Sequence, residues 1–219
     1  MSIALIGGAG AGLGAALGRR FAKSHDVVLS SRTRGERADL RDEKQVIELF
    51  ERVEKRGPID VAIFNAGAFF RGSVLDTPAQ TFEDVWRLAC YAGFLFGREA
   101  ARRMVPRGRG TILFTGATAS LRGGANFAAF AAAKGGLRQV AQSMARELGP
   151  KNIHVAHVVI DGPIDNPRTR ARVAERAQSL PQDGMLATDA IAEVYWQLHA
   201  QPRSAWSFET DLRPWAEKF

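Results

Sequence analysis

A glycine-rich segment near the start of the chain constrains the fold more than any other feature. The apolar run Ile3–Ile6 is followed directly by the segment 7–14, Gly-Gly-Ala-Gly-Ala-Gly-Leu-Gly, and then by residues with the apolar spacing of a helix. Glycines between a buried strand and a helix let backbone amides approach a phosphate group at the positive end of the helix. The segment therefore predicts a dinucleotide-binding turn, and a purely structural turn is the alternative.

Strands and helices alternate along the rest of the chain, which favours a parallel sheet covered by helices on both faces. The predicted strands are mostly continuous apolar runs, typical of strands buried on both faces. They are Ile3–Ile6, Val27–Ser31, Arg37–Leu40, Val61–Phe64, Thr111–Thr115, Ile153–Ile160 and Trp206–Glu209. The predicted helices are Leu13–Ser24, a segment through Val46 and Val53, a long helix starting at a Thr81–Asp84 capping box and ending near Pro106, and Phe127–Leu148.

Two connections in this single predicted α/β domain, residues 1–219, are unusual. The link between the second and third strands is only about six residues long, whereas a parallel crossover usually needs roughly a dozen or more. Either this edge is built differently or the third strand is very short. The segment 161–187 is instead a long excursion after a strand, and we expect it to cover a substrate.

Composition and charge argue against several other classes of protein. The 219 residues are 46% hydrophobic and 24% charged, as in ordinary globular domains. The single cysteine, Cys90, excludes a disulfide framework and a cysteine-rich zinc module. The arginines behind the net charge of +7 are dispersed, so we predict no nucleic-acid partner. Without a membrane-length apolar stretch or a basic leader, we expect a cytoplasmic protein with no membrane partner.

Motifs in the first part of the chain resemble those of the short-chain dehydrogenase/reductase family. The spacing of Gly8, Gly12 and Gly14 is similar to the family's TGxxxGxG turn, with Gly7 in place of the threonine. Residues 61–67, Val-Ala-Ile-Phe-Asn-Ala-Gly, resemble the NNAG motif that ends the family's fourth strand. The two motifs occur in the family's order.

Two further motifs extend the resemblance over most of the chain. Asp39-Leu40 resembles the family's pair beside the adenine, and residues 160–167 resemble its PGxIxTP segment beside the nicotinamide, altered at the first proline and the threonine. The resemblance implies a doubly wound Rossmann-type parallel sheet of about seven strands, with the cofactor across the strand ends. It implies cofactor contacts from Gly8, Gly12, Leu13, Gly14, Arg32, Asp39, Leu40, Asn65, Ala66, Gly67, Lys134 and Ile164.

The end of the second strand indicates which dinucleotide is bound. An acidic residue there accepts hydrogen bonds from the ribose 2′-hydroxyl of NAD, whereas arginine suits the 2′-phosphate of NADP. This strand ends Ser31-Arg32-Thr33-Arg34, with no carboxylate. We therefore predict NADP(H) in preference to NAD(H), because guanidinium groups bind phosphate in a planar fork. Two merely exposed loop arginines are the alternative.

The family's catalytic positions are mostly replaced. Its members use a tyrosine, a lysine one helical turn later, a serine that polarises the substrate carbonyl, and an asparagine that supports a proton relay. The alignment places Phe130 at the tyrosine and Lys134 at the lysine. Ala117 stands at the serine and Ala89 at the asparagine. Only Lys134 keeps its side-chain chemistry, as a ligand of the cofactor ribose.

Three hydroxyl groups near these positions are candidate substitutes for the missing proton donor, although capping or packing roles are the alternative: Thr118, Ser120 and Tyr91. We predict no metal site, because the histidines lie outside the aligned positions and structural roles are the default for them. These are His25, His154, His157 and His199.

Two hypotheses for the function follow. In the first, the protein is an NADP(H)-dependent oxidoreductase that acts on a carbonyl or alcohol substrate with an unusual proton donor. In the second, it is a noncatalytic NADP(H)-binding sensor or interaction protein. For either, the alanine-rich helix around Ala128–Ala133 and the helix through Phe94 predict a homodimer or homotetramer with two-fold symmetry.

Overall fold

The computed structural model describes residues 1–172 and 180–217, in which seven parallel strands form one sheet of order β3-β2-β1-β4-β5-β6-β9. The strands are β1 (Ile3–Gly7), β2 (Asp26–Ser31), β3 (Glu36–Arg37), β4 (Ile59–Phe64), β5 (Gly110–Thr115), β6 (Ile153–Ile160) and β9 (Glu209–Leu212). The chain runs outward from β1 to β3 and then returns to the other side of β1. The predicted doubly wound α/β sheet is confirmed, with its switch point between β1 and β4.

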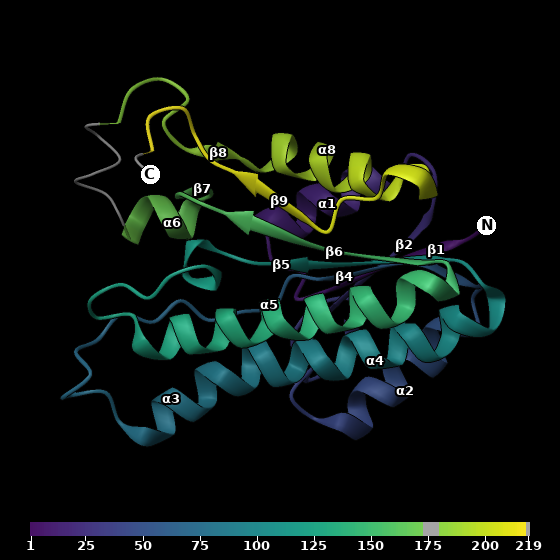
Figure 1. Cartoon of the computed structure of the whole chain (residues 1–219), viewed down its shortest axis with the longest axis horizontal. Helices are drawn as coiled ribbons and strands as arrows, with labels where there is room; N and C mark the ends of the chain where they lie inside the picture. Colours follow the sequence, from purple (N-terminus) through teal and green to yellow (C-terminus); the bar gives the residue numbers. More distant parts are fainter. Residues whose placement is uncertain (173–179, 218–219) are drawn as a thin grey trace.

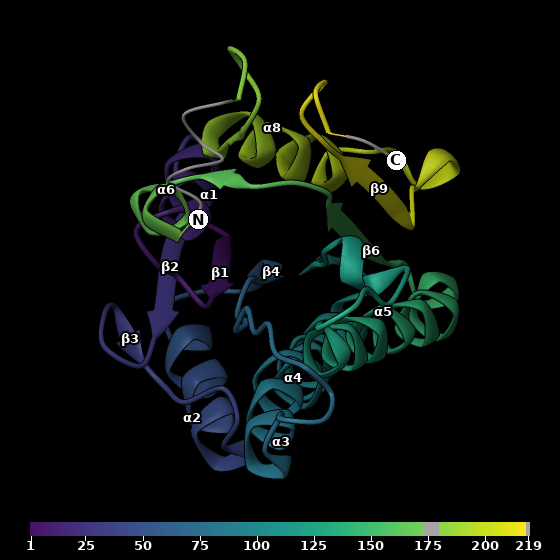
Figure 2. The same cartoon turned by 90° about the vertical axis from the view of Figure 1, so that its left-hand side faces the viewer.

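Helices cover both faces of the sheet (Figures 1 and 2). One face carries α1 (Leu13–Phe21) and α8 (Thr188–His199), and the other carries α2 (Glu43–Glu54), α4 (Ala92–Met104) and α5 (Ala128–Leu148). The helix α3 (Ala79–Trp86) packs against α5. After β6 the chain forms a small second sheet of β7 (Ile164–Asp165) and β8 (Leu186–Ala187), with α6 (Pro167–Arg172) between them.

The strand side chains alternate between the two helical layers. In β1, Ile3 and Leu5 pack with the layer of α2, α4 and α5, whereas Ala4 and Ile6 pack with α1 and α8. Both layers are apolar, so every position of the strand is buried, which explains the continuous apolar run. Each fully buried isoleucine or leucine side chain contributes about 1.5–3 kcal/mol, so the two cores hold the central strands rigidly.

The short link after β2 is explained by a very short third strand. β3 contains only Glu36 and Arg37, and it runs parallel to the end of β2. The connecting loop is closed by Ser31, whose hydroxyl accepts a hydrogen bond from the Arg34 amide at 2.8 Å. The predicted strand Arg37–Leu40 is therefore wrong in length, and no crossover helix is present between β2 and β3.

The predicted last strand, Trp206–Glu209, is also wrong, because β9 begins only at Glu209. The preceding residues are bound to other partners. The Trp206 ring stacks on His154 at a centroid distance of 4.9 Å, and the Ser207 amide donates to the Gln201 side chain at 2.7 Å. These contacts hold residues 206–207 in a loop outside the strand ladder.

Two helix boundaries differ from the prediction. The Thr81–Asp84 capping box is wrong, since α3 already begins at Ala79. The expected long helix also contains a π-helical turn, Arg87–Tyr91, between α3 and α4. The first helix ends at Phe21 instead of Ser24. None of the described helices combines the length and apolar character that crossing a bilayer requires.

Candidate active site

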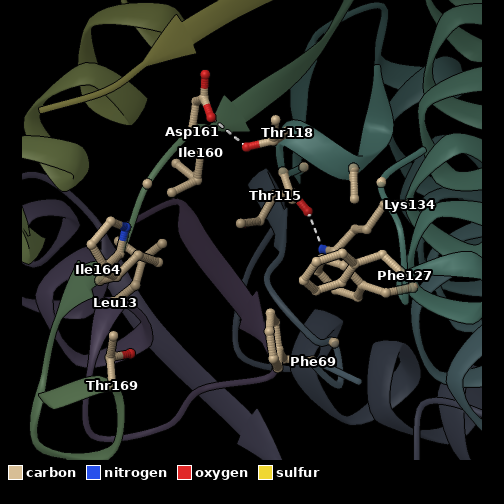
Figure 3. A pocket seen from close by; sticks show the side chains of 18 of the residues that line it. Leu13, Phe69, Thr115, Thr118, Phe127, Lys134, Ile160, Asp161, Ile164 and Thr169 are labelled. Carbon is tan, nitrogen blue, oxygen red and sulfur yellow. Dashed lines mark hydrogen bonds between the residues drawn. The ribbon is translucent and has the colours of Figure 1, made fainter. Parts of the chain in front are cut away.

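A cavity of about 650 Å³ lies at the carboxyl ends of the central strands (Figure 3). Its lining includes Leu13 from the glycine turn, Asn65 after β4, Thr115 at the end of β5, Lys134 of α5 and Ile164 of β7. These residues come from five separate segments that the parallel strands bring to one edge. Such a crevice beside the switch point is where open α/β sheets bind their ligands.

The glycine turn needs its glycines for close backbone packing. Gly8 has a φ of +82°, and a Cβ there would lie 2.4 Å from the amide nitrogen of Ala66. A Cβ on Gly14 would lie 2.7 Å from the Cα of Ala9. The turn therefore packs directly on the residues after β4 and holds the start of α1, capped by Gly12, at the edge of the cavity.

Lys134 is buried and points towards the end of β5. Its ammonium donates a hydrogen bond of 2.7 Å to the carbonyl oxygen of Thr115. Burial lowers the pKa of Lys134 to about 8, so the side chain is still mostly charged at neutral pH. An ammonium has three donors, and Lys134 lines the cavity, so it has donors left for a bound hydroxyl group. Gly67 lies next to this ammonium, since a Cβ on Gly67 would be 3.4 Å from Lys134 Nζ.

A chain of hydrogen bonds fixes the floor of the cavity. The Thr115 hydroxyl donates to Asn65 Oδ1 at 3.1 Å, and the Asn65 side-chain amide donates to the Gly8 carbonyl at 3.2 Å. The Tyr195 hydroxyl lies 2.8 Å from the Thr115 hydroxyl and donates to it, because the single proton of Thr115 goes to Asn65. Burial raises the pKa of Tyr195, so this hydroxyl stays neutral.

Thr115 and Tyr195 were missed by the sequence analysis. Tyr195 lies on α8, far along the chain from β5, and no local spacing links the two residues. The predicted helices also leave out residues 188–199, where α8 lies.

The position aligned with the family's tyrosine forms part of an aromatic wall. The ring of Phe130 packs at 5.5 Å from that of Phe69, which in turn lies 5.7 Å from Phe127. All three line the cavity. The wall gives this side of the cavity an apolar surface and offers no proton donor.

The other two replaced positions differ in location. Ala117 lines the cavity, whereas Ala89 is absent from its described lining and is fully buried among Val85, Ala129 and Ala133. Ala89 lies in the π-helical turn Arg87–Tyr91, a kind of turn that is frequent at functional sites. The structure therefore brings Phe130, Lys134 and Ala117 together, and it leaves Ala89 in the packing behind them.

Among the three candidate substitutes, only Thr118 lines the cavity. Its hydroxyl donates to Asp161 Oδ1 at 2.5 Å (Figure 3). The Ser120 hydroxyl instead accepts the Ala117 amide at 3.1 Å, and Tyr91 stacks on Trp86 at a centroid distance of 6.1 Å.

Asp161 is a buried carboxylate at the edge of the cavity. Its second oxygen lies 3.2 Å from an Arg213 nitrogen. Sequence reasoning missed Asp161 because it stands where the family's motif has a proline, and its partner Thr118 comes from a different strand end. One indication of this residue was present in the sequence: a carboxylate where the family's motif has a proline.

The predicted adenine-side residues lie beyond the described lining of the cavity, next to the glycine turn. The carbonyl of Ser30 in β2 accepts hydrogen bonds from the amides of Gly8 and Ala9 at 2.9 and 3.0 Å. This brings Arg32, which follows β2, to the same edge of the sheet. Arg32 and Arg34 are exposed, and neither forms an ion pair with any residue in 1–172 or 180–217.

Asp39 and Leu40 occupy this edge in different ways. The carboxylate of Asp39 binds the Arg41 guanidinium at 2.6 Å, and this hydrogen bond holds the pKa of Asp39 below its usual range. Leu40 is buried against the backbone of Gly7. Asp39, whose carboxylate also interacts with the charge of Arg32, is therefore already paired with Arg41.

The excursion after β6 contributes directly to the cavity over the part that the structure describes, residues 161–172 and 180–187. Asn166 accepts the Thr169 amide at 3.0 Å, which caps α6. The Asn166 side chain also lies against the glycine turn, because a Cβ on Gly12 would be 3.3 Å from it. Residues 173–179 of the predicted excursion lie outside the described residues.

The fold and the cavity define an α/β protein of the dinucleotide-binding type, and comparisons with known proteins give its family. The sequence model of a family described as enoyl-(acyl carrier protein) reductase matches residues 9–204. The 3-oxoacyl-[acyl-carrier-protein] reductase MabA of Mycobacterium avium is 32% identical over 80% of this chain and 71% of its own. The cyclic-di-GMP-binding biofilm dispersal mediator protein of Escherichia coli is 34% identical over 74% of this chain and 72% of its own.

Solved structures agree. A short-chain dehydrogenase from Rhodopseudomonas palustris is 41% identical, covers 98% of this chain and 99% of its own, and superposes with a TM-score of 0.84. The structure of ElxO with NADP bound has a TM-score of 0.87 over 96% of both chains, but its 18% identity shows the fold alone. The chain belongs to the short-chain dehydrogenase/reductase family of oxidoreductases, as its motifs predicted.

Proposed function

We propose that this protein binds NADP(H) across the glycine turn and the cavity, and that it is an oxidoreductase for a carbonyl or alcohol substrate. The observation that carries the proposal is the position of Lys134, a buried lysine in the same cavity as Leu13 of the glycine turn and Ile164. A charged donor opposite apolar side chains suits a ribose hydroxyl next to a nicotinamide ring. MabA, a relative at 32% identity, is named as a reductase.

Residues of this chain fit each part of the cofactor. The backbone of Gly8, Gly12 and Gly14 would hold the pyrophosphate, at a turn where a Cβ on Gly8 or Gly14 would clash with the backbone. Leu13 and Ile164, which line the cavity, would hold the nicotinamide, and Lys134 would donate a hydrogen bond to its ribose. When bound, the cofactor supplies or accepts the hydride. Arg32, Asp39 and Leu40 would contact the adenosine half, and Asn65, Ala66 and Gly67 would contact the cofactor where the glycine turn meets the end of β4.

The preference for NADP(H) rests on charge. Arg32 and Arg34 form no salt bridge within the described parts of the chain, so both guanidinium groups are available to a 2′-phosphate. Asp39 is bound to Arg41 and is a poor acceptor for a ribose hydroxyl. The edge therefore attracts an extra phosphate and offers little to the 2′-hydroxyl of NAD(H).

Thr118 and Asp161 are the proposed replacement for the missing proton donor. The Thr118 hydroxyl lines the cavity and is 2.5 Å from the Asp161 carboxyl group. In a reduction, the Asp161 carboxylate positions Thr118, the hydroxyl proton of Thr118 goes to the substrate oxygen, and solvent water returns a proton to Thr118. A positioned proton donor of this kind typically contributes about 10²–10⁴-fold in rate. Ala117 next to Thr118 supplies no side-chain donor.

The substrate has an apolar body in this proposal. Phe69, Phe127 and Phe130 line one side of the cavity, and the segment after β6 covers the other. An apolar group packed on these rings places its carbonyl towards Thr118 and Lys134. The described residues of the excursion that line the cavity, from Asp161 to Thr169, then cover the bound substrate.

A noncatalytic sensor is the second candidate, and a specific observation favours it. Phe130 and Ala89 are both accommodated in packed apolar surroundings, so the loss of the usual proton donors leaves no structural defect. The Escherichia coli relative at 34% identity is named for binding a cyclic dinucleotide.

The two candidates are separated by measuring NADPH binding and turnover together. We expect the wild type to bind NADPH and to reduce reactive carbonyls such as diketones slowly. Thr118→Val removes the turnover and keeps the binding, whereas Thr118→Ser, the matched control, keeps both. Binding without turnover across a broad carbonyl panel supports the sensor, and no NADPH binding at all refutes both candidates.

A further inference from the structure

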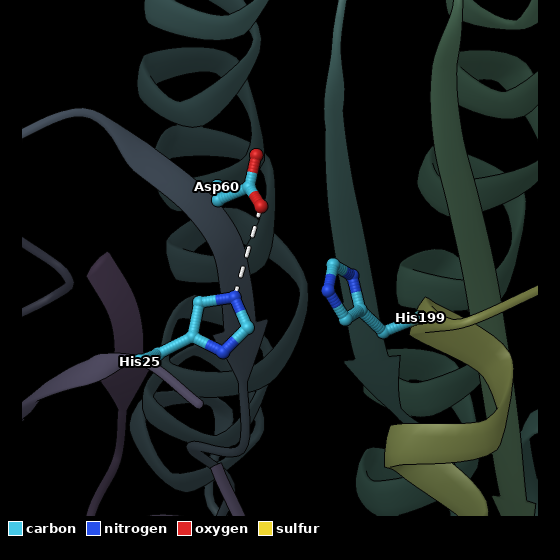
Figure 4. Close-up of side chains that lie close together, drawn as sticks. All are labelled: His25, Asp60 and His199. Carbon is cyan, nitrogen blue, oxygen red and sulfur yellow. Dashed lines mark ion pairs between the residues drawn. The ribbon is translucent and has the colours of Figure 1, made fainter. Parts of the chain in front are cut away.

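Two histidines and an aspartate converge near the amino ends of the central strands (Figure 4). The cavity lies at the other ends of these strands. His25 lies between α1 and β2, Asp60 is near the start of β4, and His199 ends α8. One ligand atom from each lies within 4.8 Å of the other two. Asn65 of the cavity follows the end of β4, so the cluster and the cavity lie at opposite ends of this strand, and the cluster takes no part in cofactor binding.

Hydroxyl groups hold both imidazoles through their Nδ1 atoms. His25 Nδ1 is 2.9 Å from the Ser24 hydroxyl, and His199 Nδ1 is 2.9 Å from the Thr111 hydroxyl. Ser24 donates its own proton to the Phe21 carbonyl at 3.4 Å, so it accepts from His25 Nδ1. With its proton on Nδ1, His25 has a free Nε2 lone pair, and His199 has the same free lone pair when its Nδ1 donates to Thr111. Hydrogen bonds of this kind orient histidines that bind metals through their other nitrogen.

The ligand atoms face one another without bonding. His25 Nε2 is 3.7 Å from Asp60 Oδ2, which is longer than a hydrogen bond. Within residues 1–172 and 180–217, the Nε2 atoms of His25 and His199 make no hydrogen bond. The other Asp60 oxygen, Oδ1, forms an ion pair with Arg109 Nε at 3.7 Å.

Aromatic packing keeps the two imidazoles in place. Their ring centroids are 5.3 Å apart, and Trp196 lies 6.0 Å from His25 and 5.4 Å from His199. His25 is only 7% exposed, but the Asp60 side chain is 23% exposed, so solvent and a small ion can reach the cluster. The site is therefore largely formed before any ligand arrives.

We propose that His25, Asp60 and His199 bind one divalent first-row transition ion such as Zn²⁺, with water completing the coordination. Two imidazoles and a carboxylate suit zinc and its neighbours, and they do not suit Mg²⁺ or Ca²⁺, which prefer oxygen ligands. Metal–ligand distances of about 2.0–2.2 Å require ligand atoms roughly 3.3 Å apart, so the three side chains move inwards by about 1 Å or less.

The ion would connect three separate parts of the fold: the turn before β2, the start of β4 and the end of α8. It would thus stabilise the folded chain, because an ion that binds only the folded state raises the free energy of unfolding. The sequence shows no sign of this site, since its ligands are scattered and none has the short spacing of a metal-binding motif.

The test is a calorimetric titration of the EDTA-treated, untagged full chain with Zn²⁺, together with thermal unfolding. We expect one Zn²⁺ per chain and a higher Tm at saturation, with Mg²⁺ giving neither. His25→Asn, Asp60→Asn and His199→Asn each weaken Zn²⁺ binding by at least about tenfold. The control His154→Asn removes a nearby histidine outside the cluster and changes the affinity by no more than about twofold.

A second measurement uses the wild type, in case a variant does not fold. On addition of Zn²⁺, the imidazole ¹⁵N resonances of His25 and His199 shift, and those of His157 do not. The proposal is overturned if Zn²⁺ fails to saturate at one equivalent, if binding survives the three substitutions, or if other histidines are the ones that shift. NADPH is absent from both experiments, so their result is independent of the proposed oxidoreductase function.

Discussion

Phe130 and Lys134 lie one turn apart on α5, and both side chains line the same cavity. Residues with this spacing share one face of a helix. The Lys134 ammonium donates to the Thr115 carbonyl at 2.7 Å, while the Phe130 ring packs at 5.5 Å from Phe69. The helix therefore keeps the lysine of the family's pair and presents an aromatic ring where the proton donor would lie.

Cofactor preference is the first prediction. We expect NADPH to bind at least tenfold more tightly than NADH, which corresponds to about 1.4 kcal/mol, because Arg32 and Arg34 form no salt bridge in the described structure. Calorimetric titration of both cofactors measures this ratio. Arg32→Ala should remove most of the preference, whereas Arg52→Ala, in an exposed ion pair with Glu36, should not. Equal affinities for NADPH and NADH would refute the phosphate contact.

The buried Lys134 gives the second prediction, a pH-dependent stability. Its pKa is about 8 in the folded protein against 10.5 for an ordinary lysine. Between pH 8 and pH 10.5 the unfolded chain therefore binds more protons than the folded protein. The free energy of unfolding rises with pH over this range, because the cost of burying a charged Lys134 is gradually removed. Below pH 8 that cost is fully present. Relative to Lys134→Met, the wild type should gain roughly 2–3 kcal/mol in the free energy of unfolding between about pH 7 and pH 10.

Urea unfolding of both proteins at the two pH values measures this difference directly. Subtracting the variant cancels the titration of the other groups. A difference that is the same at both values would mean that Lys134 titrates normally in the folded protein.

Assembly is the third prediction. We expect the helix around Ala128–Ala133 and the helix through Phe94 to pack against copies of themselves in a two-fold symmetric oligomer. Phe94 and Trp86 leave 40% and 37% of their surface exposed, which suits such an interface. Sedimentation velocity at micromolar concentration should show a dimer or tetramer, and Phe94→Glu should dissociate it. Leu75→Glu, at a residue that is 91% exposed outside these helices, is the control. A wild type that sediments as a monomer would count against the interface.

The parts of the structure that the sequence predicted are those with a local pattern. The apolar run of β1 and the glycine turn are contiguous, and each has a physical requirement that few other residues satisfy: burial on both faces for Ile3–Ile6 and a positive φ for Gly8. The two-residue strand β3 has too few side chains to show alternation, so its length could not be read from sequence.

The parts that the sequence did not predict depend on contacts between distant residues. The Thr118–Asp161 pair joins the ends of two strands, and Tyr195 reaches Thr115 from a helix on one face of the sheet. Ala89 aligned with a catalytic position, but only the fold shows that it is buried behind the cavity. Alignment gives the position of a residue along the chain, and packing determines whether its side chain reaches the substrate.

This packing changes the design of the variant that should restore the usual chemistry. Phe130→Tyr and Ala117→Ser introduce hydroxyl groups at two residues that line the cavity. Ala89→Asn would add a polar side chain at a fully buried residue, at a cost of about 1–3 kcal/mol from overpacking. The double variant therefore comes first, and Ala89→Asn is added to it only if the double variant is stable.

One measurement tests most directly whether the cavity is a catalytic site: the rate of NADPH oxidation in the presence of a quinone or diketone. The rate is compared between the wild type and the double variant Phe130→Tyr/Ala117→Ser. In the double variant, the introduced phenol group would have the Lys134 ammonium one turn away to lower its pKa. We predict a rate at least about tenfold above that of the wild type, because a phenol beside an ammonium is a stronger acid than the Thr118 hydroxyl. A folded double variant that binds NADPH but is no faster than the wild type on any of these carbonyls would contradict the claim that the cavity is a catalytic site that has lost the family's usual tyrosine and serine.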